Sequence, residues 1–72
     1  MFVILVPNPI NSECPLYLVQ MNIDDETVYF LSDINQAWKF ETAENASDLV
    51  DFMVNVGMDF ITSDMYPTVT SI

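Results

Sequence analysis

The chain has 72 residues, of which 51% are hydrophobic, and its 11 Asp and Glu side chains face a single cation, Lys39, for a net charge of -10. A chain this short supports one hydrophobic core, so we expect one domain over residues 1–72, too rich in apolar residues to be a disordered acidic tail. The lack of cations argues against direct binding to nucleic acid or to anionic membranes, because both interactions depend on Lys and Arg.

The first predicted element is a strand at residues 2–6, a continuous apolar run typical of a strand buried on both faces. Pro7 and Pro9 then end it in a loop. The run is too short to span a membrane and has no basic leader, and the lone Cys14 cannot form an internal disulfide. We therefore expect a cytoplasmic protein, with Cys14 packed as a small apolar side chain because acidic surroundings disfavour a thiolate.

A hairpin follows. Alternating apolar side chains predict a strand at residues 16–23, and the β-rich run at residues 27–31 predicts its partner. Asp24, Asp25 and Glu26 lie between them at the hairpin tip. Carboxylates can bind hard cations, but the calcium-loop spacing is missing. We therefore favour a solvated tip over a metal site and expect no cofactor.

Residues 32–36 are turn-like, and residues 37–40 form a short extended segment. Trp38 and Phe40 in this segment are either core side chains or an exposed aromatic anchor for a partner. The core is favoured for Phe40, and both roles stay open for Trp38.

The only predicted helix begins after Thr42, a suitable N-cap, has Glu44 in its first turn and ends at Gly57. Helical spacing predicts a core-facing stripe composed of Ala43, Ala46, Leu49, Val50, Met53 and Val54. Residues 59–62 are expected to form a brief final strand, and residues 63–72 a loosely attached tail. The predicted fold is α+β: a small antiparallel sheet of three to four strands with one helix packed on it, in β-β-β-α-β order.

Three acidic residues of the helix, Glu44, Asp48 and Asp51, follow one another at spacings of four and three and therefore share one exposed face. Like charges at these spacings cost about 0.2–0.5 kcal/mol per pair, and Lys could relieve them at little expense. Acidic surfaces commonly serve solubility alone. Because the chain has one cation in total, we favour a partner-binding surface over a coat that serves solubility.

Catalysis has little support, because the chain has no His, its cysteine has no neighbouring base in sequence, and Lys39 belongs to no recognisable motif. A pair of carboxylates could perform acid and base chemistry, but 72 residues can hardly enclose a substrate cleft. We expect a protein that is not an enzyme.

The segment from Phe30 to Ala46 has an aromatic residue, two further residues, Asp33, and then Ala-x-x-Phe-x-Thr-x-Glu-x-Ala from Ala37 onward. It resembles small hairpin-then-helix modules, many of them encoded by bacteriophages, and it covers 17 of the 72 residues. The size, acidity and lack of cations are similar in type to phage inhibitors of host DNA-binding machinery, which include DNA-mimic and anti-CRISPR proteins. The resemblance implies a fold and a class of function, and it assigns no binding residue.

Two functional hypotheses follow. In the first, an inhibitor blocks the basic site of a host nucleic-acid-binding protein, for example a defence protein, and its contacts are Glu44, Asp48 and Asp51, joined by Asp24, Asp25 and Glu26. In the second, a structural or accessory subunit self-associates or joins a larger assembly through apolar surface, with Trp38 or an edge strand as the contact. A homodimer through residues 2–6 or the final segment is a variant of the second hypothesis.

Overall fold

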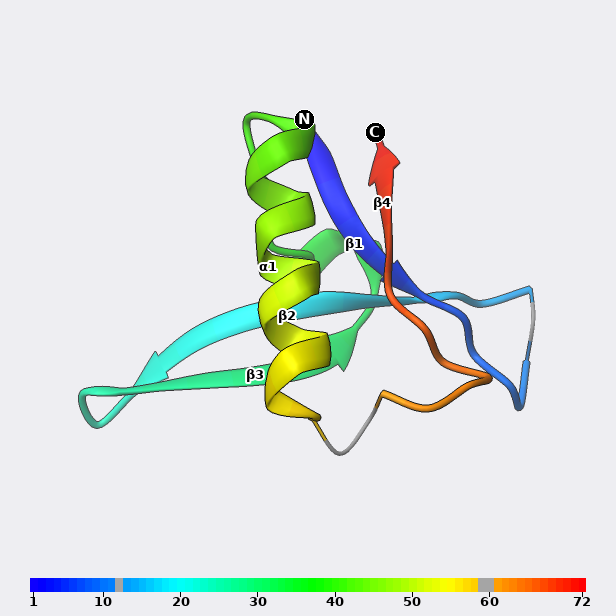
Figure 1. Ribbon diagram of the computed structural model, residues 1–72, viewed down its shortest axis with the longest axis horizontal. Helices are drawn as coiled ribbons and strands as arrows, with labels where there is room; N and C mark the ends of the chain where they lie inside the picture. The colour runs from blue at the N-terminus through cyan, green and yellow to red at the C-terminus, as the bar shows by residue number, and fades with distance from the viewer. Residues whose placement is uncertain (12, 59–60) are drawn as a thin grey trace.

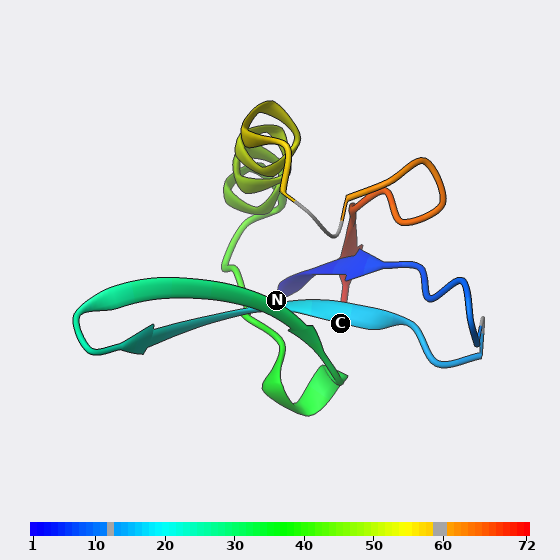
Figure 2. The ribbon, with the colours of Figure 1, turned by 90° about the horizontal axis from the view of Figure 1, so that it is seen from below.

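The computed structural model describes residues 1–11, 13–58 and 61–72. Its strands form one antiparallel sheet in the order β3-β2-β1-β4, with a helix on one face (Figures 1 and 2). The elements along the chain are β1 (Phe2–Val6), β2 (Leu16–Ile23), β3 (Glu26–Ser32), the short 3-10 helix η1 (Ile34–Gln36), α1 (Ala43–Val56) and β4 (Thr68–Ser71). The predicted α+β fold in β-β-β-α-β order is confirmed.

β1 lies in the interior of the sheet. Val3 and Ile4, which point to opposite faces, are both fully buried, so the prediction of a strand buried on both faces is confirmed. β1 pairs with β4 over most of its length but with β2 only at Leu5 and Val6. The free edges of the sheet are therefore β3 and β4, and the expectation that residues 2–6 offer an edge for dimerisation is wrong.

The extended segment at residues 37–40 fills the space where β1 and β2 diverge. The Trp38 N–H donates to the Leu18 carbonyl at 2.9 Å, and Phe40 exchanges two backbone hydrogen bonds of 2.8 Å with Phe2. The segment thus reaches from β2 to β1, and it carries Phe40 into the core beside Ile4.

The helix has the predicted ends. The Thr42 side chain accepts a hydrogen bond from the Asn45 N–H at 3.1 Å, which satisfies one of the free amides of the first turn. Gly57 adopts the left-handed conformation, with φ 72° and ψ 53°, and its N–H donates to the Met53 carbonyl.

The buried stripe of the helix is narrower than the sequence predicts. Ala46 and Met53 are fully buried against Ile4, Leu18 and Phe40, and Leu49 and Val50 are half-buried. Ala43 and Val54 are exposed, because both lie at the margin of the stripe where the small sheet no longer reaches. No helix among the described residues has the length and apolar content needed to cross a membrane.

The C-terminal segment corrects two predictions. Asp59 and Phe60, from the strand expected at residues 59–62, lie outside the described residues, and Ile61 and Thr62 are not in a strand. The last strand is β4, which pairs with β1 from Phe2 opposite Ser71 to Leu5 opposite Thr68. Residues 63–72 are therefore not a loose tail, because their β-branched run completes the sheet and Pro67 before it is buried.

Candidate partner-binding surfaces

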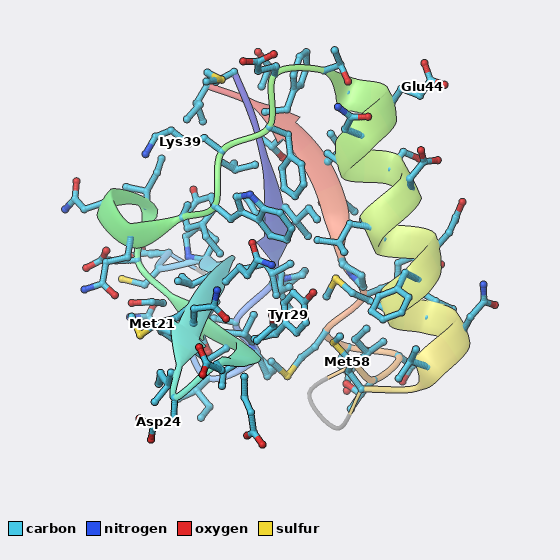
Figure 3. All side chains as sticks on the ribbon, turned by 90° about the vertical axis from the view of Figure 1, so that its left-hand side faces the viewer. Met21, Asp24, Tyr29, Lys39, Glu44 and Met58 are labelled. Atoms are coloured by element: carbon cyan, nitrogen blue, oxygen red, sulfur yellow. The ribbon has the colours of Figure 1, made fainter. Side chains whose placement is uncertain are left out.

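The acidic residues of α1 form one outward-facing row, which we call the helix stripe: Glu44, Asp48 and Asp51. All three side chains are exposed. At 3.6 residues per turn they project opposite to the buried Ala46 and Met53, and they follow the axis at intervals of about 4.5 to 6 Å. Figure 3 shows Glu44 pointing away from the sheet. The stripe is therefore a solvent-facing row of carboxylates on a rigid element.

No cation belongs to the helix, and its last turn has no basic residue. The one Lys of the chain, Lys39, extends from the segment before the helix on the side away from Glu44 (Figure 3). The carboxylates of the helix stripe are thus left to interact with water, dissolved ions or a cationic partner. Their fields add over the surface and decay over about 8 Å at physiological salt.

The hairpin tip has the predicted turn, with one adjustment. Asp24 and Asp25 form a two-residue turn, and both have positive φ, 52° and 65°. Such a turn matches the twist of the two strands and tolerates Asp better than most residues. Glu26 is already the first residue of β3, paired with Ile23. Among the described residues, no three His, Cys, Asp or Glu side chains gather closely enough to hold a metal ion.

The two acidic groups belong to separate surfaces. The hairpin projects sideways from the rest of the molecule, so that its tip lies well beyond the helix (Figures 1 and 2). The structure therefore brings Glu44, Asp48 and Asp51 together and leaves Asp24, Asp25 and Glu26 as a second group at the end of the hairpin. A partner that touches both groups would have to span the molecule.

Trp38 is part of an aromatic cluster. Its ring centroid lies 4.4 Å from that of Phe40 and 6.3 Å from that of Tyr29. Phe40 is 8% exposed, and Trp38 is half-buried against the core. Phe40 is therefore a core side chain, as the sequence favours, and a role for the half-buried Trp38 as a partner contact stays a prediction.

An apolar surface that the sequence analysis missed lies on the outer part of the hairpin. Met21, Ile23 and Val28 are 44%, 48% and 36% exposed, and register places them on one face of β2 and β3. We call them the hairpin face. Tyr29, on the opposite face, packs against the core that the helix covers, so Met21 points away from the helix (Figure 3).

The alternating pattern did signal this surface, since it continues unbroken as far as Ile23. Alternation predicts a strand, but it does not say which of the two faces of that strand is covered. Whether a second layer covers that face depends on distant parts of the chain. Here the helix covers the other face, and η1 lies against β2 (Figure 2).

Cys14 is exposed, so the prediction that it packs as an apolar side chain is wrong. It lies in the loop between β1 and β2, where its backbone N–H donates to the Asn11 carbonyl at 3.1 Å. Three prolines, Pro7, Pro9 and Pro15, and several polar residues favour a loop outside the core.

Comparison with protein-family models, curated proteins and solved structures found no match. The function is therefore argued from the helix stripe, the hairpin face and the charge of the chain.

Proposed function

We propose that this protein is a non-enzymatic acidic inhibitor that binds a basic, nucleic-acid-binding surface on another protein. The observation that carries the proposal is the helix stripe: three exposed carboxylates on the outward face of α1, in a chain of net charge -10. The resemblance to phage inhibitors extends the proposal to a bacteriophage protein that acts in the host cytoplasm on a defence protein.

Electrostatics supports this function in two ways. A dense anionic surface steers a cationic partner and raises the association rate, an effect that salt screens. Clefts that bind nucleic acid are lined with Lys and Arg that contact phosphates, so a folded polyanion can compete for them. The carboxylate intervals of about 4.5 to 6 Å exceed the phosphate spacing of about 3.4 Å in a DNA strand. Competition would therefore depend on the summed field more than on a match of individual charges.

The test is capture of partners from host lysate by the tagged protein at about 0.1 M and about 1 M salt, where the screening length falls from about 10 to about 3 Å. We expect capture at the lower concentration only, and loss of the captured protein in the double variant D48N/D51N. Added DNA should elute the same protein, because both ligands compete for one site.

The matched control is E13Q/D64N, which removes the same charge from two exposed positions outside the helix. If the two double variants lose capture equally, net charge acts without a specific surface, and the helix stripe is not the contact. If capture survives both D48N/D51N and about 1 M salt, the inhibitor proposal is wrong.

A second candidate function is supported by the hairpin face. Three partly exposed apolar side chains on one surface are typical of a contact with another protein. In this alternative the chain is a structural or accessory subunit that self-associates or joins a larger assembly. Its binding would resist salt and would be lost when Ile23 is changed to Ser.

A further inference from the structure

The outer edge of β3 is an unprotected strand edge. β3 is the last strand on its side of the sheet, and its 7 residues contain no Pro, Gly or Lys, which commonly block such edges. The other edge strand, β4, has only 4 residues and follows directly after Pro67. β3 is therefore the edge on which another strand can be added over the greater length.

The hydrogen bonds of β2 show which groups of β3 point outward. The Leu18 carbonyl accepts from the Trp38 N–H, so Leu18 turns its backbone polar groups away from its partner, Leu31. In an antiparallel pair, residues whose N–H and C=O groups point away from the partner strand alternate with residues whose N–H and C=O groups bond to it. By this alternation the N–H and C=O groups of Thr27, Tyr29 and Leu31 point away from β2. None of them takes part in a backbone hydrogen bond to another segment among the described residues.

The side chains beside the β3 edge determine which contacts an added strand would make. Val28 and Phe30 lie next to the edge on the side away from the helix, and Met21 lies across from Val28. Towards the tip the apolar surface gives way to Glu26 and then to Asp24 and Asp25. An added strand would therefore place alternate side chains against an apolar surface that ends in three carboxylates.

We propose that the β3 edge binds an extended, cationic segment of the partner by β-strand addition. Apolar side chains of that segment would cover the hairpin face, and its Lys or Arg side chains would lie near Glu26 and the tip. The inference rests on the proposed function and deepens it, since it gives the basic partner a second contact that the helix stripe does not supply.

Charge favours this occupant over a second copy of the chain. A second copy would bring a further net charge of -10 and a second acidic tip to the interface, with one Lys to offset them. A cationic segment neutralises the same carboxylates. Like charges placed side by side in an interface oppose association, and opposite charges speed it.

The experiment is an amide-resolved NMR titration of the whole protein with three capped synthetic peptides, each as long as the 7 residues of β3. The first alternates Lys and Val, the second alternates Glu and Val, and the third alternates Lys and Ser. We expect the Lys/Val peptide to shift the amides of Thr27, Tyr29 and Leu31 and to protect them from hydrogen exchange. The other two peptides should bind at least about tenfold more weakly, since each lacks one of the two complementary features.

Two variants locate the contact. In T27P the ring removes one outward N–H and leaves the ladder to β2, so the affinity for the Lys/Val peptide should fall at least about tenfold. M21T/V28T keeps every backbone group and places Thr, a good strand former, at both positions. It should lower the affinity for the Lys/Val peptide towards that for the Lys/Ser peptide. If T27P disturbs the fold, the double variant still tests the contact of the peptide with the hairpin face, and hydrogen-exchange protection of the Thr27, Tyr29 and Leu31 amides tests the contact with the edge.

Three outcomes would overturn the inference. Lys/Val shifts confined to α1 would assign all binding to the helix stripe and leave the proposed function intact. Equal binding of the Glu/Val peptide would remove the role of charge at this edge. Concentration-dependent broadening of the β3 amides without peptide would show that a second copy occupies the edge. The proposed function is tested by a separate experiment, the capture of partners from lysate with D48N/D51N, so its failure can be told apart from failure of this inference.

Discussion

The outer hairpin, residues 20–28, and the rest of the described residues, which we call the body, both contain strands with alternating apolar side chains, but these strands have different roles. In the body, Ile4, Leu18 and Met53 are fully buried between sheet and helix. In the outer hairpin every residue is exposed, although Met21, Ile23 and Val28 repeat the alternation seen in a core strand. The difference is that a layer covers the first region and none of the described residues covers the second.

This contrast separates stability from recognition. Burial of apolar area stabilises the fold in the body, at about 25 cal/mol per Å² removed from water. The outer hairpin contributes little of that area, so its side chains can change without loss of the fold. A surface that a protein can vary freely is suited to contact with a partner.

The largest test of the contrast compares one residue type in both regions. Ile4→Ala should lower the free energy of unfolding by about 2–5 kcal/mol, because it opens a cavity among buried side chains. Ile23→Ala should cost less than about 1 kcal/mol, since Ile23 is 48% exposed. Urea denaturation followed by far-ultraviolet circular dichroism measures both values. Similar losses would mean that the outer hairpin is part of the folding core.

The next test concerns the link between helix and body. Thr42→Ala should cost about 1 kcal/mol, because it removes the side-chain oxygen that accepts from the Asn45 N–H. Ser47→Ala, an exposed substitution within the same helix, is the control and should be neutral or slightly stabilising. Equal effects of the two substitutions in thermal unfolding would show that the cap adds nothing to the stability of the body.

A third test addresses the hairpin turn alone. Asp24 and Asp25 both have positive φ, so the double variant D24N/D25G, with the preferred residues for this turn, should stabilise the hairpin by about 0.5 kcal/mol. Hydrogen exchange at Val28 should slow, while exchange at Ile4 stays unchanged. D64G, outside any turn with positive φ, should not stabilise the protein. Slower exchange throughout the molecule would show that hairpin and body open together.

The sequence predicted those features that neighbouring residues decide. The hairpin, the Thr42 cap, the Gly57 end of the helix and the helix stripe all follow from spacings of a few residues. Each is confirmed in the structure, because capping hydrogen bonds, turn residues and periodicity within a few residues specify them.

Features that depend on distant contacts were harder to predict. β4 becomes a strand by pairing with β1, more than sixty residues away along the chain, and the short run at residues 68–71 carries no strong signal alone. Trp38 is half-buried because β1 and β2 diverge around its segment, and Cys14 is exposed because its loop stays outside the core. The distance between the hairpin tip and the helix stripe is likewise set by how the elements pack, so the spacing of residues along the chain does not predict it.

The smallest expected effect comes from the helix stripe and separates function from stability most sharply. D48N/D51N removes like charges three residues apart, so it should raise the free energy of unfolding by about 0.2–0.5 kcal/mol at low salt. The gain should shrink at about 1 M salt, where the repulsion is screened in the original protein as well. Urea denaturation at both salt concentrations measures it, with E13Q/D64N as the charge-matched control. A variant that is more stable yet loses its partner would show that the repulsion within the stripe is kept for binding, whereas a destabilised variant would mean that these carboxylates hold the helix in place.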